Sequence, residues 1–165
     1  IYLLGSSSFS AHLAGEKGLP YAFASHFAPA HLYDALRLYR EYFRPSAQLE
    51  MPYSMACVNV IAADTDAEAN RLATSLYQFA MGIVTNVRRP LPPPVETMDG
   101  IWNKDQEAMI KNMMHYTFIG SKKTIAERLS EFVANTRVDE IIAVSHMYDH
   151  KVRLRSYEIL REIFF

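Results

Sequence analysis

The stretch that decides the fold is Tyr53–Ala69, YSMACVNVIAADTDAEA. From Tyr53 to Ala63 the run is almost continuously apolar and does not alternate, which predicts a strand covered on both faces. Polar residues follow at once, and Thr65 and Glu68 have the spacing of a helix capping box. The stretch therefore predicts a buried strand that passes directly into a helix.

The same order of strand and helix recurs along the chain. The other expected strands are Ile1–Gly5, Tyr21–Phe27 and Val138–His146, and a helix follows each of them, the first over Ser10–Lys17 and ended by Gly18. Strands that alternate with helices form a parallel sheet in an α/β fold. The residues alone leave two closures open, a doubly wound open sheet and half of a (β/α)₈ barrel.

Apolar residues recur at helical spacing in the expected helices, and each set predicts a buried face. The sets are Leu32, Leu36, Tyr39 and Phe43; Leu72, Leu76 and Phe79; Ile125, Leu129 and Phe132; and Val152, Leu154, Tyr157, Leu160 and Ile163. One stretch, Arg88–Trp102, breaks the rhythm, because its four prolines from Pro90 to Pro94 exclude a helix and a central strand. We expect either a lid-like loop or a passive surface linker there.

Composition excludes several classes of protein. The chain has 17 basic and 18 acidic residues and a net charge of −1, which recruits neither nucleic acid nor an anionic membrane. Its one cysteine, Cys57, excludes an internal disulfide, favours a reducing compartment and is expected to be a small buried residue. No apolar run approaches the roughly 20 residues that span a bilayer. We expect a cytoplasmic protein with no membrane or nucleic-acid partner.

A serine-rich turn, GSSSFS at residues 5–10, follows the first expected strand. Hydroxyls and backbone amides at a junction of strand and helix meet the positive end of the helix dipole, and such a junction binds anions. Ser6, Ser7 and Ser10 can each donate to a phosphate oxygen. Ordinary capping of the helix by serine explains the same residues without a ligand.

Three motifs in this order resemble the C-terminal half of the bacterial luciferase-like flavin monooxygenases. They are the serine-rich turn followed by AGEKGLPYAFA, the junction VIAADTDAEA, and the tail IGSKKTIAERL with VDEIIAVS. The resemblance covers essentially the whole chain. It implies a TIM barrel of which residues 1–165 supply strands five to eight, their helices and a proline-rich excursion, with the N-terminal half of the domain absent.

The resemblance also implies a cofactor and a site. Members of the family bind FMN, and Ser6, Ser7 and Ser10 match the turn that holds its phosphate, whereas Ser25 and His26 match positions that line the isoalloxazine pocket. The implied function is an FMN-dependent monooxygenase that applies reduced flavin and oxygen to a small organic substrate. A separate reductase would supply the flavin, and the protein would be a homodimer.

Other chemistry-bearing residues receive simpler interpretations. His146 ends a strand and is expected to be structural, and Asp64 is expected to cap a helix. The histidine spacing matches no metal motif, so we predict no metal site. No nucleophile elbow of the GxSxG type is present. The resemblance assigns the catalytic residues to the absent half, so they are unknown for this chain.

Three functions stay open. The leading one is the FMN-dependent monooxygenase. Because half a barrel exposes strand edges and an apolar face, we expect this chain alone to be inactive. The first alternative is a half-barrel that binds flavin or phosphate without catalysis, or that serves as a dimerising piece. The second is an oxidoreductase of the same fold that uses the deazaflavin F420.

Overall fold

The computed structural model describes residues 1–87 and 89–165. Arg88, the first residue of the proline-rich stretch, lies outside the described residues. The elements in chain order are β1 (Leu3–Gly5), α1 (Ser8–Glu16), β2 (Tyr21–Phe23), the short 3₁₀ helix η1 (Pro29–His31), α2 (Leu32–Glu41), β3 (Ser54–Ala62), α3 (Asp66–Val84), α4 (Lys104–Met113), β4 (Thr117–Gly120), α5 (Lys122–Thr136), β5 (Glu140–Val144) and α6 (His150–Phe164).

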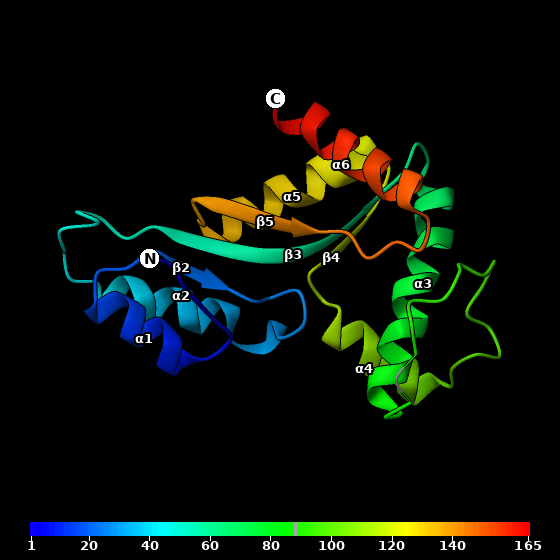
Figure 1. Cartoon of the computed structure of the whole chain (residues 1–165), viewed down its shortest axis with the longest axis horizontal. Helices are drawn as coiled ribbons and strands as arrows, with labels where there is room; N and C mark the ends of the chain where they lie inside the picture. The colour runs from blue at the N-terminus through cyan, green and yellow to red at the C-terminus, as the bar shows by residue number, and fades with distance from the viewer. Residues whose placement is uncertain (88) are drawn as a thin grey trace. The chain divides into compact units, whose positions relative to one another are not determined.

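The five strands form one sheet (Figure 1). The order is β1-β2-β3-β4, and β5 pairs with β3. The pairs β1/β2, β2/β3 and β3/β4 are parallel, with Leu3 opposite Tyr21, Tyr21 opposite Ser54 and Asn59 opposite Thr117. The predicted α/β fold with a parallel sheet is therefore confirmed. The sequence did not predict the strand β4 or the helix α4.

Strand β3 is buried at all nine positions, as its continuous apolar run predicts. The chain divides into two compact units, residues 1–58 with 132–143 and residues 59–131 with 144–165. The division falls within β3. Each unit therefore builds its core on one part of this strand, and the two units are described separately below.

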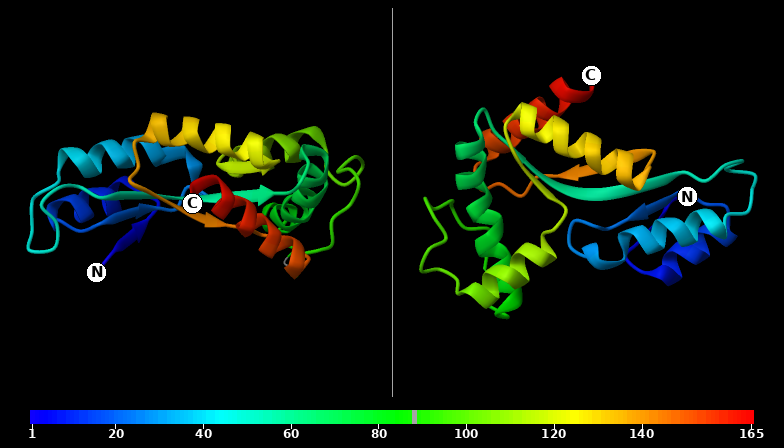
Figure 2. Two further views of the ribbon diagram at one scale, coloured as in Figure 1. Left: turned by 90° about the horizontal axis from the view of Figure 1, so that it is seen from above. Right: turned by 180° about the vertical axis from the view of Figure 1, so that it is seen from behind.

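In the first unit, α1 and α2 lie side by side (Figures 1 and 2). Leu32, Leu36 and Tyr39 are at most 1% exposed, so the predicted buried face of α2 is confirmed at these positions, whereas Phe43 lies beyond the end of the helix and is partly buried. The close approach depends on Gly15, where a Cβ atom would lie 2.9 Å from the carbonyl oxygen of Tyr39. The Tyr39 hydroxyl donates to the carbonyl oxygen of Leu19, 2.9 Å away, and thereby ties α2 to the loop before β2.

In the second unit, α3 and α4 pack together around an apolar cluster (Figures 1 and 2). The cluster contains Ile61, Ala63, Ala69, Leu72, Ala73, Leu76, Ala80, Ile110, Met114 and Met147. Helix α6 is attached by a buried hydroxyl, because Ser156 Oγ accepts the backbone N–H of Ala62 at 3.0 Å. Ser156, Ile159 and Leu160 are its buried residues. Leu154 and Tyr157, which the apolar pattern assigned to the buried face, are 47% and 39% exposed.

We predict that Gly18→Ala lowers the free energy of unfolding by roughly 1–3 kcal/mol. Gly18 ends α1 with φ of 60°, as the predicted left-handed cap requires, and an added Cβ would lie 2.4 Å from the carbonyl oxygen of Arg44. Urea denaturation measures the effect. Lys17→Ala is the matched control: Lys17, the residue before Gly18, is exposed and has φ of −86°, so its replacement should change stability by less than about 0.5 kcal/mol. Equal stability of the two variants would contradict the strain at Gly18.

Candidate functional site

The serine-rich turn forms the N-terminus of α1. Ser7 is the N-cap, and its side chain accepts the backbone N–H of Ser10 at 3.3 Å. Ser10 completes a reciprocal capping box, and its hydroxyl also donates to the carbonyl oxygen of Ser7 at 2.8 Å. Both serines therefore shape the turn, and the capping role that the sequence allowed is present in the structure.

Gly5 and Tyr21 hold the serine-rich turn in place. A Cβ atom at Gly5 would lie 2.1 Å from Ser10 Oγ, so only glycine lets the end of β1 approach the helix this closely. The Tyr21 hydroxyl lies 3.1 Å from Ser10 Oγ and donates to the carbonyl oxygen of Ser7 at 3.4 Å. Tyr21 is fully buried, and this burial raises the pKa of its hydroxyl, which stays protonated. Tyr21 joins the site only through these tertiary contacts and was not predicted from the sequence.

The geometry of the turn suits an anion. The first N–H groups of a helix have no acceptor within the helix, and the dipole makes this end positive. The first turn of α1 carries no acidic residue, and Ser7, Ser8 and Phe9 are exposed. The N–H groups of Ser8 and Phe9 are therefore donors that a phosphate group can reach, and the exposed Ser7 hydroxyl, which donates to Ser10 Oγ at 3.3 Å, lies beside them.

Ser25 and His26 lie beside this turn, at the end of the neighbouring strand. The backbone N–H of Ala24 donates to the carbonyl oxygen of Gly5 at 2.9 Å and joins the two strand ends. Ser25 is fully buried, and its hydroxyl donates to the carbonyl oxygen of Cys57 at 2.5 Å. His26 packs edge-to-face on Phe27 with ring centroids 4.6 Å apart. The structure therefore brings all five predicted site residues to one edge of the first unit's sheet.

In the second unit, His146 follows the end of β5 and contacts Asn59 of β3. The Asn59 amide nitrogen lies 3.3 Å from Thr117 Oγ1 and 3.8 Å from Met114 Sδ. Because a thioether only accepts hydrogen bonds, the amide oxygen is turned toward His146, and His146 Nδ1 donates to it at 3.3 Å. The neutral ring therefore carries its proton on Nδ1 and keeps Nε2 as an acceptor.

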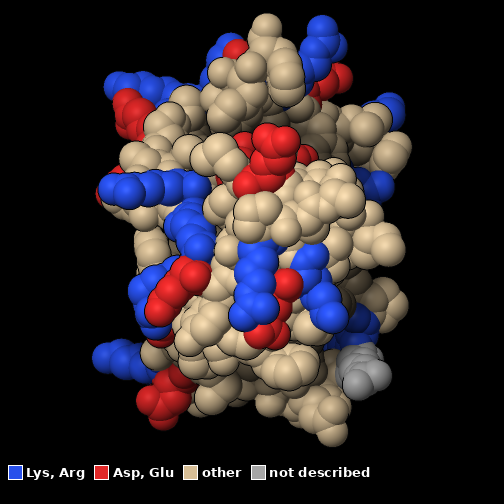
Figure 3. Space-filling model, turned by 90° about the vertical axis from the view of Figure 1, so that its left-hand side faces the viewer, with Lys and Arg blue, Asp and Glu red and all other residues tan. Residues whose placement is uncertain are grey.

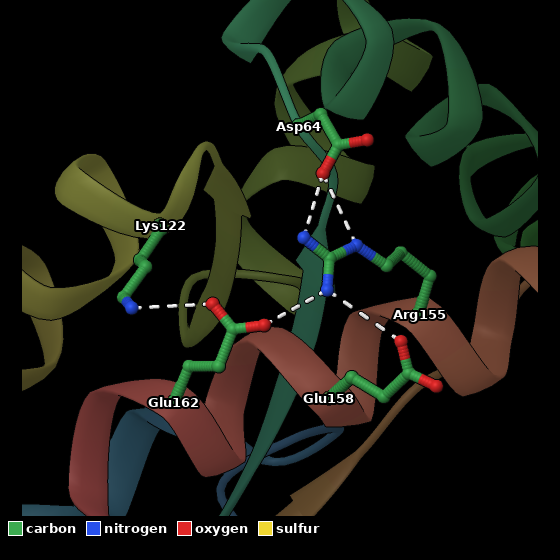
Figure 4. A network of polar contacts seen from close by, with 5 residues as sticks. All are labelled: Asp64, Lys122, Arg155, Glu158 and Glu162. Carbon is green, nitrogen blue, oxygen red and sulfur yellow. Dashed lines mark hydrogen bonds and ion pairs between the residues drawn. The ribbon is translucent and has the colours of Figure 1, made fainter.

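Asp64 has a different role from the one that the sequence suggested. The N-cap of α3 is Thr65, whose side chain accepts the N–H of Glu68 at 3.2 Å. Asp64 instead accepts two hydrogen bonds from Arg155, at 2.9 and 3.1 Å (Figure 4). Arg155 also pairs with Glu162 at 2.9 Å, and the guanidinium lowers the pKa of Glu162. The strand-end carboxylate is therefore part of an ion-pair network that attaches α6.

The described residues contain no group of three or more His, Cys, Asp or Glu side chains that could hold a metal. None of the described helices is long and apolar enough to cross a membrane. On the face drawn in Figure 3, basic and acidic side chains are interspersed. Cys57 is 6% exposed, as predicted, and burial raises the pKa of its thiol.

Comparison with known families identifies the class of protein. The sequence model that describes the luciferase-like monooxygenase family matches residues 1–140 of this chain. The chain therefore belongs to the luciferase-like monooxygenase family, as its motifs indicated.

Particular relatives share nearly the whole chain. The Bacillus subtilis (strain 168) protein YvbT is 47% identical over 163 residues, which are 99% of this chain and 48% of that protein. A luciferase-like monooxygenase of Escherichia coli (strain K12) is 40% identical over 163 residues, which are 49% of its own length. The crystal structure of apo-MsnO8 matches with a TM-score of 0.89 and 31% identity, over 99% of this chain and 50% of that one. The chain thus spans about half the length of the relatives it matches.

We predict that His146 titrates below the ordinary histidine pKa of about 6.5. Burial against its neighbours, which include Phe79, is the main cause of the lowered pKa, and the positive charge of Arg153 adds to it. The unfolded chain then binds a proton more readily than the folded one, so the free energy of unfolding falls as the pH drops through this range.

The NMR shift of the His146 ring proton against pH measures this pKa. Arg153→Gln should raise the midpoint only in part, because burial is the larger cause. A wild-type midpoint at or above 6.5 would show that the ring is not shielded as described.

Proposed function

We propose that the protein containing this chain is an FMN-dependent monooxygenase that uses reduced flavin and molecular oxygen on a small organic substrate. The observation that carries the proposal is the serine-lined N-terminus of α1, free of acidic residues, in a member of the luciferase-like monooxygenase family. A solved neighbour at 20% identity and a TM-score of 0.63 is the oxygenating constituent of 3,6-diketocamphane monooxygenase in complex with FMN.

The residues present fit a flavin phosphate. Ser6 and Ser7 would contact the phosphate oxygens together with the first-turn N–H groups of α1. Ser10 is proposed as the third serine of this site, and its bonds to Ser7 keep the turn in shape. A phosphate carries about two negative charges at neutral pH, and charge-assisted hydrogen bonds to it are the strong kind.

His26 and Ser25 are proposed to line the pocket of the flavin ring. Ser25 contributes as a fixed wall, because its hydroxyl proton is committed to Cys57. Bound reduced FMN would supply the electrons that activate oxygen. The part of the chain would be to hold the phosphate, orient the ring and exclude water.

The remaining proposals concern the whole protein. We propose that this chain forms the C-terminal half of a (β/α)₈ barrel, strands five to eight with their helices, that a separate reductase supplies the reduced flavin, and that the protein is a cytoplasmic homodimer. The same fold also occurs in F420-dependent enzymes, among them a tetrahydromethanopterin reductase at 11% identity and a TM-score of 0.59. F420 is therefore the second candidate cofactor.

We predict that Ser7→Asp weakens FMN binding about tenfold or more without lowering the melting temperature. Aspartate is a good N-cap, so the helix is preserved, but its charge repels a phosphate at this position. Ser7→Asn is the matched neutral control and should bind FMN within a few-fold of the wild type. Isothermal titration of the full-length protein measures both.

Riboflavin, which has no phosphate, gives the internal control, since Ser7→Asp should leave its affinity unchanged. If Ser7→Asp binds FMN as tightly as the wild type, the phosphate lies elsewhere. Tight binding of F420 with no binding of FMN would favour the second candidate. Oxygen uptake with reduced FMN then separates an oxygenase from a protein that only binds flavin.

A further inference from the structure

The proline-rich segment, residues 89–102, is attached to α3. Side chains of the helix form hydrogen bonds with the backbone of the segment. The Thr74 hydroxyl accepts the N–H of Val95 at 2.8 Å and lies 3.1 Å from the carbonyl oxygen of Val95. The Gln78 amide donates to the carbonyl oxygen of Pro93 at 3.1 Å. Thr74 is 5% exposed, so its two contacts with Val95 are partly shielded from water, whereas the bond from Gln78 is exposed. The segment is therefore held against the helix at positions fixed by side chains of α3.

A cavity of about 730 Å³ lies between the last turns of α3 and this segment. Phe79, Val87, Leu91 and Ile101 are among the apolar residues that line it. Small-molecule sites commonly measure roughly 300–1,000 Å³ and are mostly apolar. The prolines restrict the backbone of the segment, and hydrogen bonds hold the segment on α3. Ligand binding therefore costs less conformational entropy here than it would in a flexible loop. The cavity therefore has the size and walls of a site for a small organic molecule.

One charged residue, Arg89, is among the residues that line the cavity. It also lines a second hollow of about 440 Å³ that shares Phe79 and Gly82 with the first. Within the described part of the chain, no carboxylate forms an ion pair with Arg89. A guanidinium binds carboxylate or sulfonate groups through two parallel N–H donors. The charge that complements this cavity is therefore negative.

One residue that lines the cavity, Phe79, also contacts the residue His146 after β5. The Phe79 ring lies almost parallel to that of His146, with an angle of 11° between the planes and centroids 6.5 Å apart. His146 follows β5, whose carboxyl end belongs to the edge where ligands bind in parallel α/β sheets. Phe79, which lines the cavity, therefore lies next to the residue that follows this strand end.

We propose that this cavity binds a small organic anion, with its apolar body against Phe79 and the proline-rich segment and its acidic group on Arg89. We assign this anion the role of the enzyme's substrate, and this assignment rests on the proposed function. The test is a binding measurement that needs no turnover.

Isothermal titration of the full-length protein compares octanoate with 1-octanol, which has the same chain length and no charge. We expect octanoate to bind about tenfold more tightly than 1-octanol, since a charge-assisted pair contributes about that factor. Arg89→Gln should reduce octanoate affinity to the level of 1-octanol and leave 1-octanol unchanged. Arg71→Gln is the matched control, because Arg71 lies on α3, which forms one wall of the cavity, but does not itself line the cavity.

Equal binding of the two probes to the wild type, no binding of octanoate, or an unchanged affinity in Arg89→Gln would each overturn the proposal. Circular dichroism checks that each variant is folded. If octanoate binds through Arg89 but the protein consumes no oxygen with reduced FMN, the anion site stands and the proposed monooxygenase function fails. The reverse result would leave the function standing and remove this site.

Discussion

The fold depends on satisfying the backbone of one strand that has no access to water. All nine residues of β3 are buried, so each N–H and C=O group of this strand needs a partner inside the protein. Strands β2, β4 and β5 supply most of them. Side chains supply others, because Asp139 accepts the N–H of Ser54, Ser156 accepts that of Ala62, and Ser145 donates to the carbonyl oxygen of Val60. The buried polar residues around β3 therefore follow from the burial of its backbone.

The candidate site follows from the same arrangement. Parallel strands end at one edge, so the helix that follows β1 begins beside the segment that follows β2, and the bond from Ala24 to Gly5 fixes the two together. Tyr21 supports the serine-rich turn from beneath. The capping bonds of Ser7 and Ser10 hold the first turn of α1 in a shape that can accept an anion. Capping and phosphate binding are thus compatible uses of the same turn.

Much of this was readable in the sequence, for physical reasons. The apolar run of β3, the periodicity of α2 and the glycine that ends α1 each reflect a local rule. The exceptions depend on contacts between distant residues. Strand β4 is only four residues long and is defined by its pairing with β3. On α6, Ser156 is buried because its hydroxyl accepts the N–H of Ala62. Tyr157 is partly exposed, and its hydroxyl accepts the N–H of Ser145. Asp64 similarly pairs with Arg155, 91 positions away.

The most direct test of the central claim is a crystal structure of the full-length protein grown with FMN. The claim is that the N-terminus of α1 holds the cofactor phosphate. The account predicts phosphate density within hydrogen-bond distance of Ser7 Oγ and of the N–H groups of Ser8 and Phe9. Density for the phosphate at any other position, with the serine-rich turn contacting only water, would contradict it and leave these serines as helix caps.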